Sequence, residues 1–124
     1  MSRLHHIALG AHNVERVAHF YRDQLGLTEI KRHFTQEGRL RSIWLDLGGA
    51  ILMVEATSAA PHRVEGIGHG PFLVVVQIEA SDRILWENRL VMAGFPIEDR
   101  TNYTSYTRDP EGNRVGVSFY PLPG

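Results

Sequence analysis

Histidine and glutamate side chains are the groups in this sequence best suited to acid–base or metal chemistry. The chain has seven histidines and no cysteine, which excludes disulfides, thiolate zinc sites and cysteine nucleophiles. His6 and Glu55 lie in segments with the alternating or apolar pattern of strands, so either could work as an acid or a base. His5 and His6 are neighbours on a predicted strand and are expected to point to opposite faces, which argues against a metal-binding pair. Each residue also has a reading without catalysis. Glu55 fits a carboxylate at the end of a strand, and His6 fits a histidine that only forms hydrogen bonds.

Aromatic and long polar side chains supply candidates for holding a small organic ligand. Trp44 lies in the middle of a predicted strand, and Tyr103 opens another. Gln77 and Arg114 are polar residues on predicted strands of the second half. Small-molecule sites combine aromatic and apolar walls with a few polar groups, so we predict that these four residues contact a ligand. Core packing explains the aromatic residues equally well, and Arg114 also fits a surface arginine.

Charge and composition exclude several classes of function. The formal net charge is -1 with a pI near 6.6, so there is no basic excess for binding nucleic acid. The longest apolar run, Phe72–Val76, is far too short to cross a membrane. No phosphate loop, dinucleotide glycine fingerprint or nucleophile elbow is present. The first residues lack the apolar stretch of a secretion signal, so we expect a cytoplasmic protein.

The elements that would position these residues begin with a strand, a helix and three more strands. The first strand is expected over Leu4–Gly10, with His6 and Ile7 on opposite faces. The helix follows the N-cap Asn13 and ends before Gly26. The three strands are expected over Leu27–Phe34, Leu40–Leu47 and Ala50–Glu55.

The second half repeats this order after a loop that contains His62 and His69. A helix is expected from the N-cap Ser81 to about Ala93. The strands around it are expected over Pro71–Ile78, Phe95–Arg100, Tyr103–Arg108 and Arg114–Tyr120, with a tight turn at 109–113. Neither half can bury its sheet alone. We therefore predict a single domain over 1–124, built from module one at 1–57, a linker at 58–70 and module two at 71–124.

Both ends of the chain resemble a known family. The segments Leu4–Leu9, Asn13–Tyr21 and Leu25–Leu27 resemble the opening of glyoxalase-like proteins, and Asp109–Val115 resembles their last turn and strand. The sequence is thus similar to the vicinal oxygen chelate superfamily, which includes glyoxalase I, bleomycin resistance proteins and extradiol dioxygenases. The resemblance implies an α+β fold in which two βαβββ modules form a curved-sheet cup. It also implies a divalent metal in the cup that acts as a Lewis acid on a chelating substrate.

The metal ligands of the family carry over only in part. The resemblance puts His6 at the first ligand position and Met53 at the second, with Glu55 two residues further along the same face. It puts Leu73 at the third position and Gly116 at the fourth. Hard divalent ions need several oxygen or imidazole donors, so we predict at most His6 and Glu55 as metal ligands and no full family coordination. Met53 is then counted among the residues that contact an organic ligand.

Three functions stay open at this point, and the sequence does not decide whether the protein is an enzyme. The first is a metal-dependent lyase, isomerase or dioxygenase of the glyoxalase type. The second is a metal-free protein that binds or sequesters a drug or metabolite, as bleomycin resistance proteins do. The third is a metal-free enzyme that uses His6 or Glu55 as acid or base. The lost ligands favour a glyoxalase-like protein without the full metal site. The expected partners are a small molecule and a second copy of the chain in a homodimer, and neither nucleic acid nor a membrane.

Overall fold

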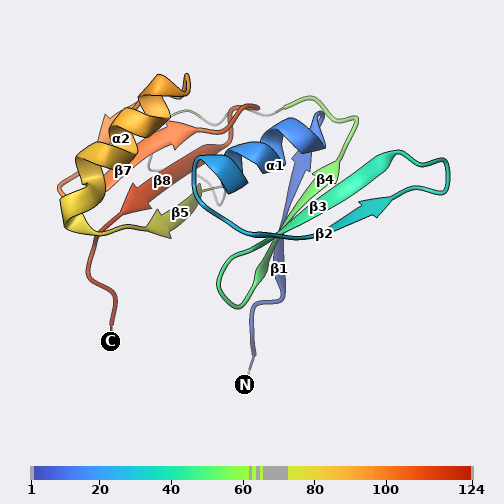
Figure 1. Cartoon of the computed structure of the whole chain (residues 1–124), viewed down its shortest axis with the longest axis horizontal. Helices are drawn as coiled ribbons and strands as arrows, with labels where there is room; N and C mark the ends of the chain where they lie inside the picture. Colours follow the sequence, from blue (N-terminus) through green and yellow to red (C-terminus); the bar gives the residue numbers. More distant parts are fainter. Residues whose placement is uncertain (1, 62, 64, 66–72, 124) are drawn as a thin grey trace. The chain divides into compact units, whose positions relative to one another are not determined.

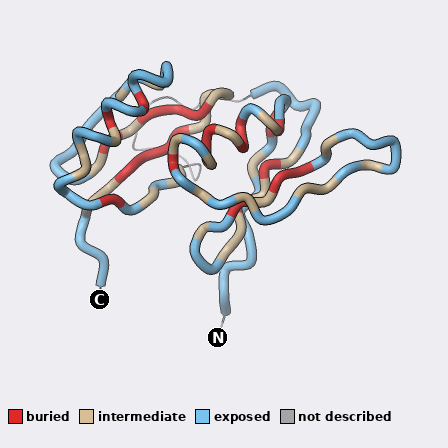
Figure 2. The backbone as a smooth tube through the Cα atoms, viewed as in Figure 1, coloured by how far each residue is buried: buried red, intermediate tan, exposed pale blue. Residues whose placement is uncertain are grey.

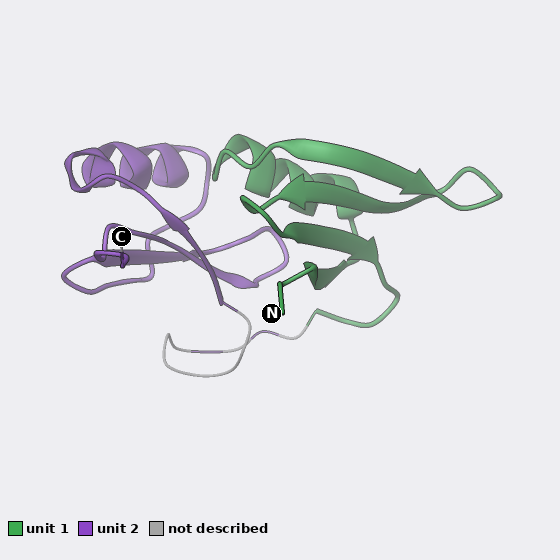
Figure 3. Cartoon of the chain, turned by 90° about the horizontal axis from the view of Figure 1, so that it is seen from below, with its two compact units in different colours: residues 1–61 green, residues 62–124 purple. Residues whose placement is uncertain are grey.

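The chain divides into two compact units, residues 1–61 and residues 62–124 (Figure 3). The computed structural model describes residues 2–61, 63, 65 and 73–123. Each unit runs strand, helix and three strands, which confirms the predicted repeat of two βαβββ modules (Figure 1). The predicted linker at 58–70 and the assembly of both modules into one domain stay predictions. His62 and His69 lie outside the described residues.

The first unit is a four-stranded mixed sheet with one helix on one face. Its strand order is β1-β4-β3-β2, with β1 parallel to β4 and the other neighbours antiparallel. The elements are β1 (His6–Ala11), α1 (Val14–Asp23), β2 (Glu29–Phe34), β3 (Leu40–Asp46) and β4 (Ile51–Ala56). The Asn13 carboxamide oxygen accepts a hydrogen bond from the backbone N–H of Arg16 at 3.0 Å, so the predicted N-cap is confirmed. Gly26 follows the helix with a φ of 76°, as its predicted role requires.

Alternation along the strands divides the residues of the first sheet between two faces. Leu52 and Val54 of β4 are fully buried on the side that α1 covers. Along each strand, the residues that alternate with the buried ones point to the other side of the sheet. We call this the helix-free face of the first sheet, and it carries His6, Ala8, Trp44, Met53 and Glu55. Buried residues of this unit lie on α1, β3 and β4 (Figure 2). The core therefore lies between sheet and helix, and the candidate site residues lie on the opposite side.

The second unit repeats this topology with shorter strands. Its strand order is β5-β8-β7-β6, with β5 parallel to β8. The elements are β5 (Leu73–Gln77), a 3-10 turn (Ala80–Asp82), α2 (Arg83–Met92), β6 (Asp99–Arg100), β7 (Thr104–Arg108) and β8 (Arg114–Ser118). No helix in the described part of the chain is long and apolar enough to cross a membrane.

Three predicted boundaries in the second unit were wrong. Ser81 does not cap the helix, because it lies inside a 3-10 turn in which the Asp82 N–H already donates to the Glu79 carbonyl at 3.0 Å. The strand expected over Phe95–Arg100 is reduced to its last two residues. Pro96 has no N–H for a ladder, and its carbonyl accepts a hydrogen bond from the Thr107 hydroxyl at 2.7 Å. The last strand ends at Ser118 rather than Tyr120.

The turn at 109–113 is confirmed. The Asp109 carboxylate accepts hydrogen bonds from the backbone N–H of Glu111 at 2.9 Å and of Asn113 at 3.0 Å. Gly112 adopts a φ of 87°, in the left-handed region that glycine tolerates best. This turn connects β7 to β8 and fixes the register in which the two strands pair.

Candidate functional site

Strand pairing arranges the candidate residues of the first unit in rows. Residues paired on neighbouring strands point to the same side of a sheet. His6 pairs with Ile51, Met53 pairs with both Ala8 and Trp44, and Glu55 pairs with both Gly10 and Ser42. Successive rows on one face are two residues apart, which is about 7 Å along the strand. Trp44 and Met53 therefore form a central row, with His6 one row to one side and Glu55 one row to the other.

His6 and Glu55 share a face but not a metal-binding position. His6 pairs with Ile51, which is four residues before Glu55 on β4, so the two rows are about 13 Å apart along the strands. The side chain beside His6 on β4 is that of Ile51, which offers no donor. The expected opposition of His5 and His6 was wrong, because their Nδ1 atoms lie 2.8 Å apart. His5 precedes β1, so strand alternation does not apply to it.

Trp44 has the most distinctive surroundings on this face. Its indole ring contacts the imidazole of His33, with ring centroids 4.5 Å apart and planes tilted by 50°. Trp44 lies on β3, where it pairs with Lys31 of β2 on one side and with Met53 of β4 on the other. The indole Nε1–H is buried and has no hydrogen-bond acceptor among the described residues. A buried donor without an acceptor costs on the order of 1–3 kcal/mol, so a ligand oxygen that displaced the side chains covering this atom would gain a hydrogen bond.

Two polar residues of this face were missed by sequence reasoning. Ser42 is fully buried, and its Oγ lies 3.2 Å from Nδ1 of His33. Ser42 stands two residues before Trp44, so strand periodicity alone places both on one face. His33 had no such signal, because the register between β2 and β3 shifts on both sides of residues 31–33. Glu55, Ser42 and His33 consequently form one polar row across three strands.

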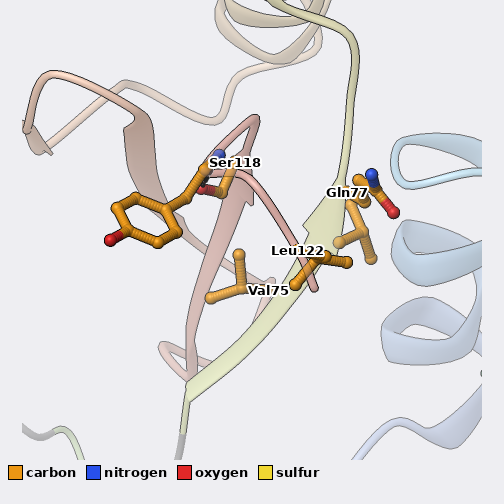
Figure 4. Close-up of a pocket in the computed structure, with 6 residues that line it drawn as sticks. Val75, Gln77, Ser118 and Leu122 are labelled. Atoms are coloured by element: carbon orange, nitrogen blue, oxygen red, sulfur yellow. Dashed lines mark hydrogen bonds between the residues drawn. The ribbon is translucent and has the colours of Figure 1, made fainter. Parts of the chain in front are cut away.

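The second unit has a pocket beside its edge strand. The pocket has a volume of about 220 Å³ and is mostly apolar (Figure 4). Its walls come from β5, β8 and the C-terminal segment, namely Val75, Val76, Gln77, Ser118, Tyr120 and Leu122. Gln77 and Ser118 pair across the parallel strands and supply the polar groups. The Ser118 hydroxyl is also 2.7 Å from that of Thr104. The predicted ligand residue Gln77 thus lines an actual pocket.

The other predicted residues of the second unit lie in different settings. Tyr103 precedes β7, and its ring packs edge-on against Tyr120, a pocket residue, with centroids 5.0 Å apart. Arg114 is buried and pairs with Leu73 and Arg108, so it does not line the pocket. Tyr103 is therefore one side chain removed from the pocket, and Arg114 belongs to the other end of β8.

The residues present do not fit the four-ligand metal site of the fold family. No group of three histidine, aspartate or glutamate side chains within the described residues is arranged to hold a metal ion. The predicted third position, Leu73, supplies no donor. A Cβ at the fourth position, Gly116, would lie 3.4 Å from side-chain atoms of Thr104 and Tyr106 and 3.2 Å from the Ser105 carbonyl. Neighbouring groups thus occupy the space in which a carboxylate would start.

A family model decides the wider relationship. The sequence matches the Glyoxalase/Bleomycin resistance protein/Dioxygenase superfamily over residues 3–117. The chain belongs to this superfamily. Membership confirms the predicted resemblance and agrees with the two βαβββ modules. No curated protein matches the sequence at a significant level.

Several solved structures of glyoxalase-superfamily type share the fold. A variant of the fosfomycin resistance protein FosX from Listeria monocytogenes, solved with Mn(II) and dihydroxypropylphosphonic acid, is 16% identical, with a TM-score of 0.79 over 98% of this chain and 95% of that one. Lactoylglutathione lyase from Agrobacterium tumefaciens is 20% identical, with a TM-score of 0.68 over 95% and 93%. TioX from Micromonospora sp. ML1 is 24% identical, with a TM-score of 0.64 over 94% and 98%. Similarity at these identities shows the fold and leaves the reaction open.

Proposed function

We propose that this chain is a small-molecule-binding member of the superfamily that holds an organic ligand on the helix-free face of its first sheet without the full metal coordination of the family. The observation that carries the proposal is the buried indole N–H of Trp44, which has no acceptor among the described residues. A ligand seated in the central row would displace the side chains that cover this N–H, and an oxygen of the ligand would accept its hydrogen bond. Burial of the donor makes that contact worth more than it would be in water.

The central row also defines the kind of ligand. Trp44 offers an aromatic edge and face, and Met53 beside it offers a polarisable thioether. Lys31 adds a positive charge on the other side of Trp44. These groups favour a flat aromatic molecule that carries an acceptor oxygen, preferably an anionic one.

His6 and Glu55 each suit the role of polar anchor for such a ligand, one on either side of the Trp44 row. Each lies one row, about 7 Å, from the Trp44 row along the strand direction. A two-ring aromatic molecule has a length of this order, so its polar substituents can reach one anchor or the other. His6 can donate or accept a hydrogen bond according to its tautomer, and ionised Glu55 accepts.

The pocket of the second unit supports the same class of ligand. Its lining is largely aliphatic and aromatic, with the Gln77 carboxamide and the Ser118 hydroxyl as polar groups. A volume of about 220 Å³ accommodates a small organic group rather than a large metabolite. We include Gln77 and Tyr103 in the proposal as contacts on this unit.

A metal-free acid–base enzyme is the second candidate, and one observation favours it. Glu55 shares a row with Ser42, whose hydroxyl is in contact with His33. Such a row places a carboxylate and an imidazole on one face, the pair of groups that general acid–base catalysis uses most often.

The proposal also covers location and assembly. We propose that the protein is cytoplasmic and forms a homodimer.

Metal content is the first expected result. Purified protein dialysed without chelator should hold zinc, nickel, iron or manganese well below one equivalent. The reason is donor number: His5 and His6 offer two exposed imidazole rings, and two ligands leave most of the coordination shell to water. Elemental analysis of the parent and of His6→Ala should therefore give the same low value, with His19→Ala on the surface of α1 as the matched control. Near-stoichiometric metal in the parent and in His19→Ala, lost only in His6→Ala, would restore the metalloenzyme hypothesis.

A further inference from the structure

Helix α2 has its polar and apolar sides reversed with respect to its own sheet. Glu87 is buried on the sheet side together with Leu90. Four large apolar side chains are instead exposed, with exposed fractions of 72% for Ile84, 66% for Leu85, 52% for Val91 and 88% for Met92. An exposed cluster of this kind is more informative than single exposed apolar residues, because it marks a surface that contacts something.

Helix α1 provides the comparison within the same chain. It buries Val17, Ala18 and Tyr21 and exposes Arg16 and Asp23, as a surface helix normally does. Both helices have ten residues and occupy equivalent places in their modules. The reversed pattern is therefore a property of the α2 sequence and not of the fold.

The charges of α2 are all directed away from this outer side. Arg83 donates to the backbone carbonyls of Thr101 and Thr104, and Glu87 accepts from Arg100 at 2.8 Å. The guanidinium of Arg89 lies over the ring of Trp86, 4.4 Å from its centroid. The outer side thus combines apolar side chains with one neutral polar residue, Asn88, which is exposed. It offers nothing that would match a charged partner.

The order of these residues is symmetric about Asn88. Leu85 and Val91 lie three residues before and after it, and Ile84 and Met92 lie four residues before and after it. At about 100° per residue, the five side chains cover an arc of about 120° on the helix. Turning the helix end over end about Asn88 therefore places apolar residues on apolar residues and Asn88 on itself.

We propose that α2 packs antiparallel against α2 of a second copy of this chain, about a twofold axis through Asn88. A twofold contact requires a self-complementary surface, in which residue i meets j and j meets i, and the symmetric order of α2 provides one. Leu85 then meets Met92 of the partner, and Ile84 meets Val91 of the partner. The two Asn88 carboxamides hydrogen-bond to each other and fix the register, as a single asparagine does between paired helices.

The size of the patch predicts a dimer of moderate affinity. The four side chains expose on the order of 500 Å² of apolar surface, within the range of the largest patch on a typical monomer, which is often functional. A stable interface buries about 800 Å² per partner, so the helix pair needs its flanking residues as well and should dissociate in the micromolar range. The proposal concerns assembly and does not depend on the ligand site.

Cysteine cross-linking tests the twofold directly, because the chain has no cysteine of its own. Packed helix axes lie about 8–10 Å apart and Cα atoms about 2.3 Å from each axis, which leaves about 4–5 Å between the Asn88 Cα atoms. A disulfide accepts this distance. Asn88→Cys in the full chain should therefore form a disulfide-linked dimer at least about tenfold faster under mild oxidation than Leu85→Cys, whose own copies would lie about 9 Å apart along the helix axes.

Ile30→Cys, on β2 and as exposed as Val91, controls for random collision. Equal cross-linking rates for Asn88→Cys and either control would overturn the proposal. Sedimentation equilibrium gives an independent reading, since the parent should move from 14.0 kDa towards twice that mass over micromolar concentrations. Met92→Lys should raise the dissociation constant at least about tenfold, because the twofold places each lysine in an apolar contact. A parent that stays monomeric, or a dimer unaffected by Met92→Lys, would equally reject the α2 contact.

Discussion

Replacing Glu87 by glutamine should destabilise the second unit by about 2 kcal/mol at neutral pH, the largest effect on stability that we expect. The Arg100 hydrogen bonds, with help from Ser105, hold the pKa of the Glu87 carboxyl at about 2 against its ordinary 4.5. That difference corresponds to roughly 3 kcal/mol, and solvent screening of the 57% exposed Arg100 reduces it. Glutamine keeps the shape and removes the charge that Arg83 and Arg100 face.

The pH dependence of this effect has a definite sign. Because the pKa of Glu87 is lower in the folded chain than in the unfolded one, its stabilisation is complete above pH 4.5 and is lost as the pH falls towards 2. Urea unfolding followed by circular dichroism should show a constant gap between parent and Glu87→Gln from pH 7 to about 5, and a shrinking gap below that. Glu79→Gln, the same change at an exposed residue, is the control. A gap that is absent at pH 7, or that widens in acid, would contradict the ion-pair account.

Loss of the Trp44 side chain should weaken ligand binding at least about tenfold, which is 1.4 kcal/mol. Anilinonaphthalene sulfonate is a suitable probe, because it combines fused aromatic rings with an anionic acceptor and fluoresces on apolar surfaces. Trp44→Leu removes both the aromatic contact and the indole N–H, so its titration should shift furthest. Trp44→Phe keeps an aromatic ring without the donor and should fall between parent and Trp44→Leu.

The matched control for this series is Trp86→Leu. Trp86 is the second tryptophan of the chain and lies on α2, where Arg89 covers its ring. Binding of the probe should be unchanged in Trp86→Leu. If Trp86→Leu and Trp44→Leu weakened binding equally, the probe would be reporting general surface hydrophobicity and the ligand site would lie elsewhere.

Local sequence signals were sufficient for most of the fold. The cap at Asn13, the glycine after α1 and the turn at 109–113 are short-range features with known geometry, and all three are present. The incorrect predictions of element boundaries arose where the backbone could adopt more than one local conformation. Ser81 is a good capping residue, but the backbone had already turned through a 3-10 segment one residue earlier. Pro96 limited the next strand to Asp99–Arg100.

The site was less predictable, because it depends on register between strands. Alternation put Met53 and Glu55 on one face, as the strand pairing does, but it could not show that the Met53 row lies between His6 and Glu55. His33 was missed because register shifts in β2 break the alternation that would have revealed it. The reversal of α2 was also hidden, since the buried state of Glu87 depends on Arg100 and Ser105, which lie far along the chain.

The most direct test of the central claim is the emission of Trp44 alone during ligand titration. Trp86→Phe leaves Trp44 as the sole tryptophan, since the chain contains two. The account predicts that anilinonaphthalene sulfonate quenches this emission saturably, with the same dissociation constant in the presence of a chelator and in the presence of excess Mn(II). Quenching that requires Mn(II), or no saturable quenching under either condition, would contradict a ligand site on the Trp44 row that works without a metal.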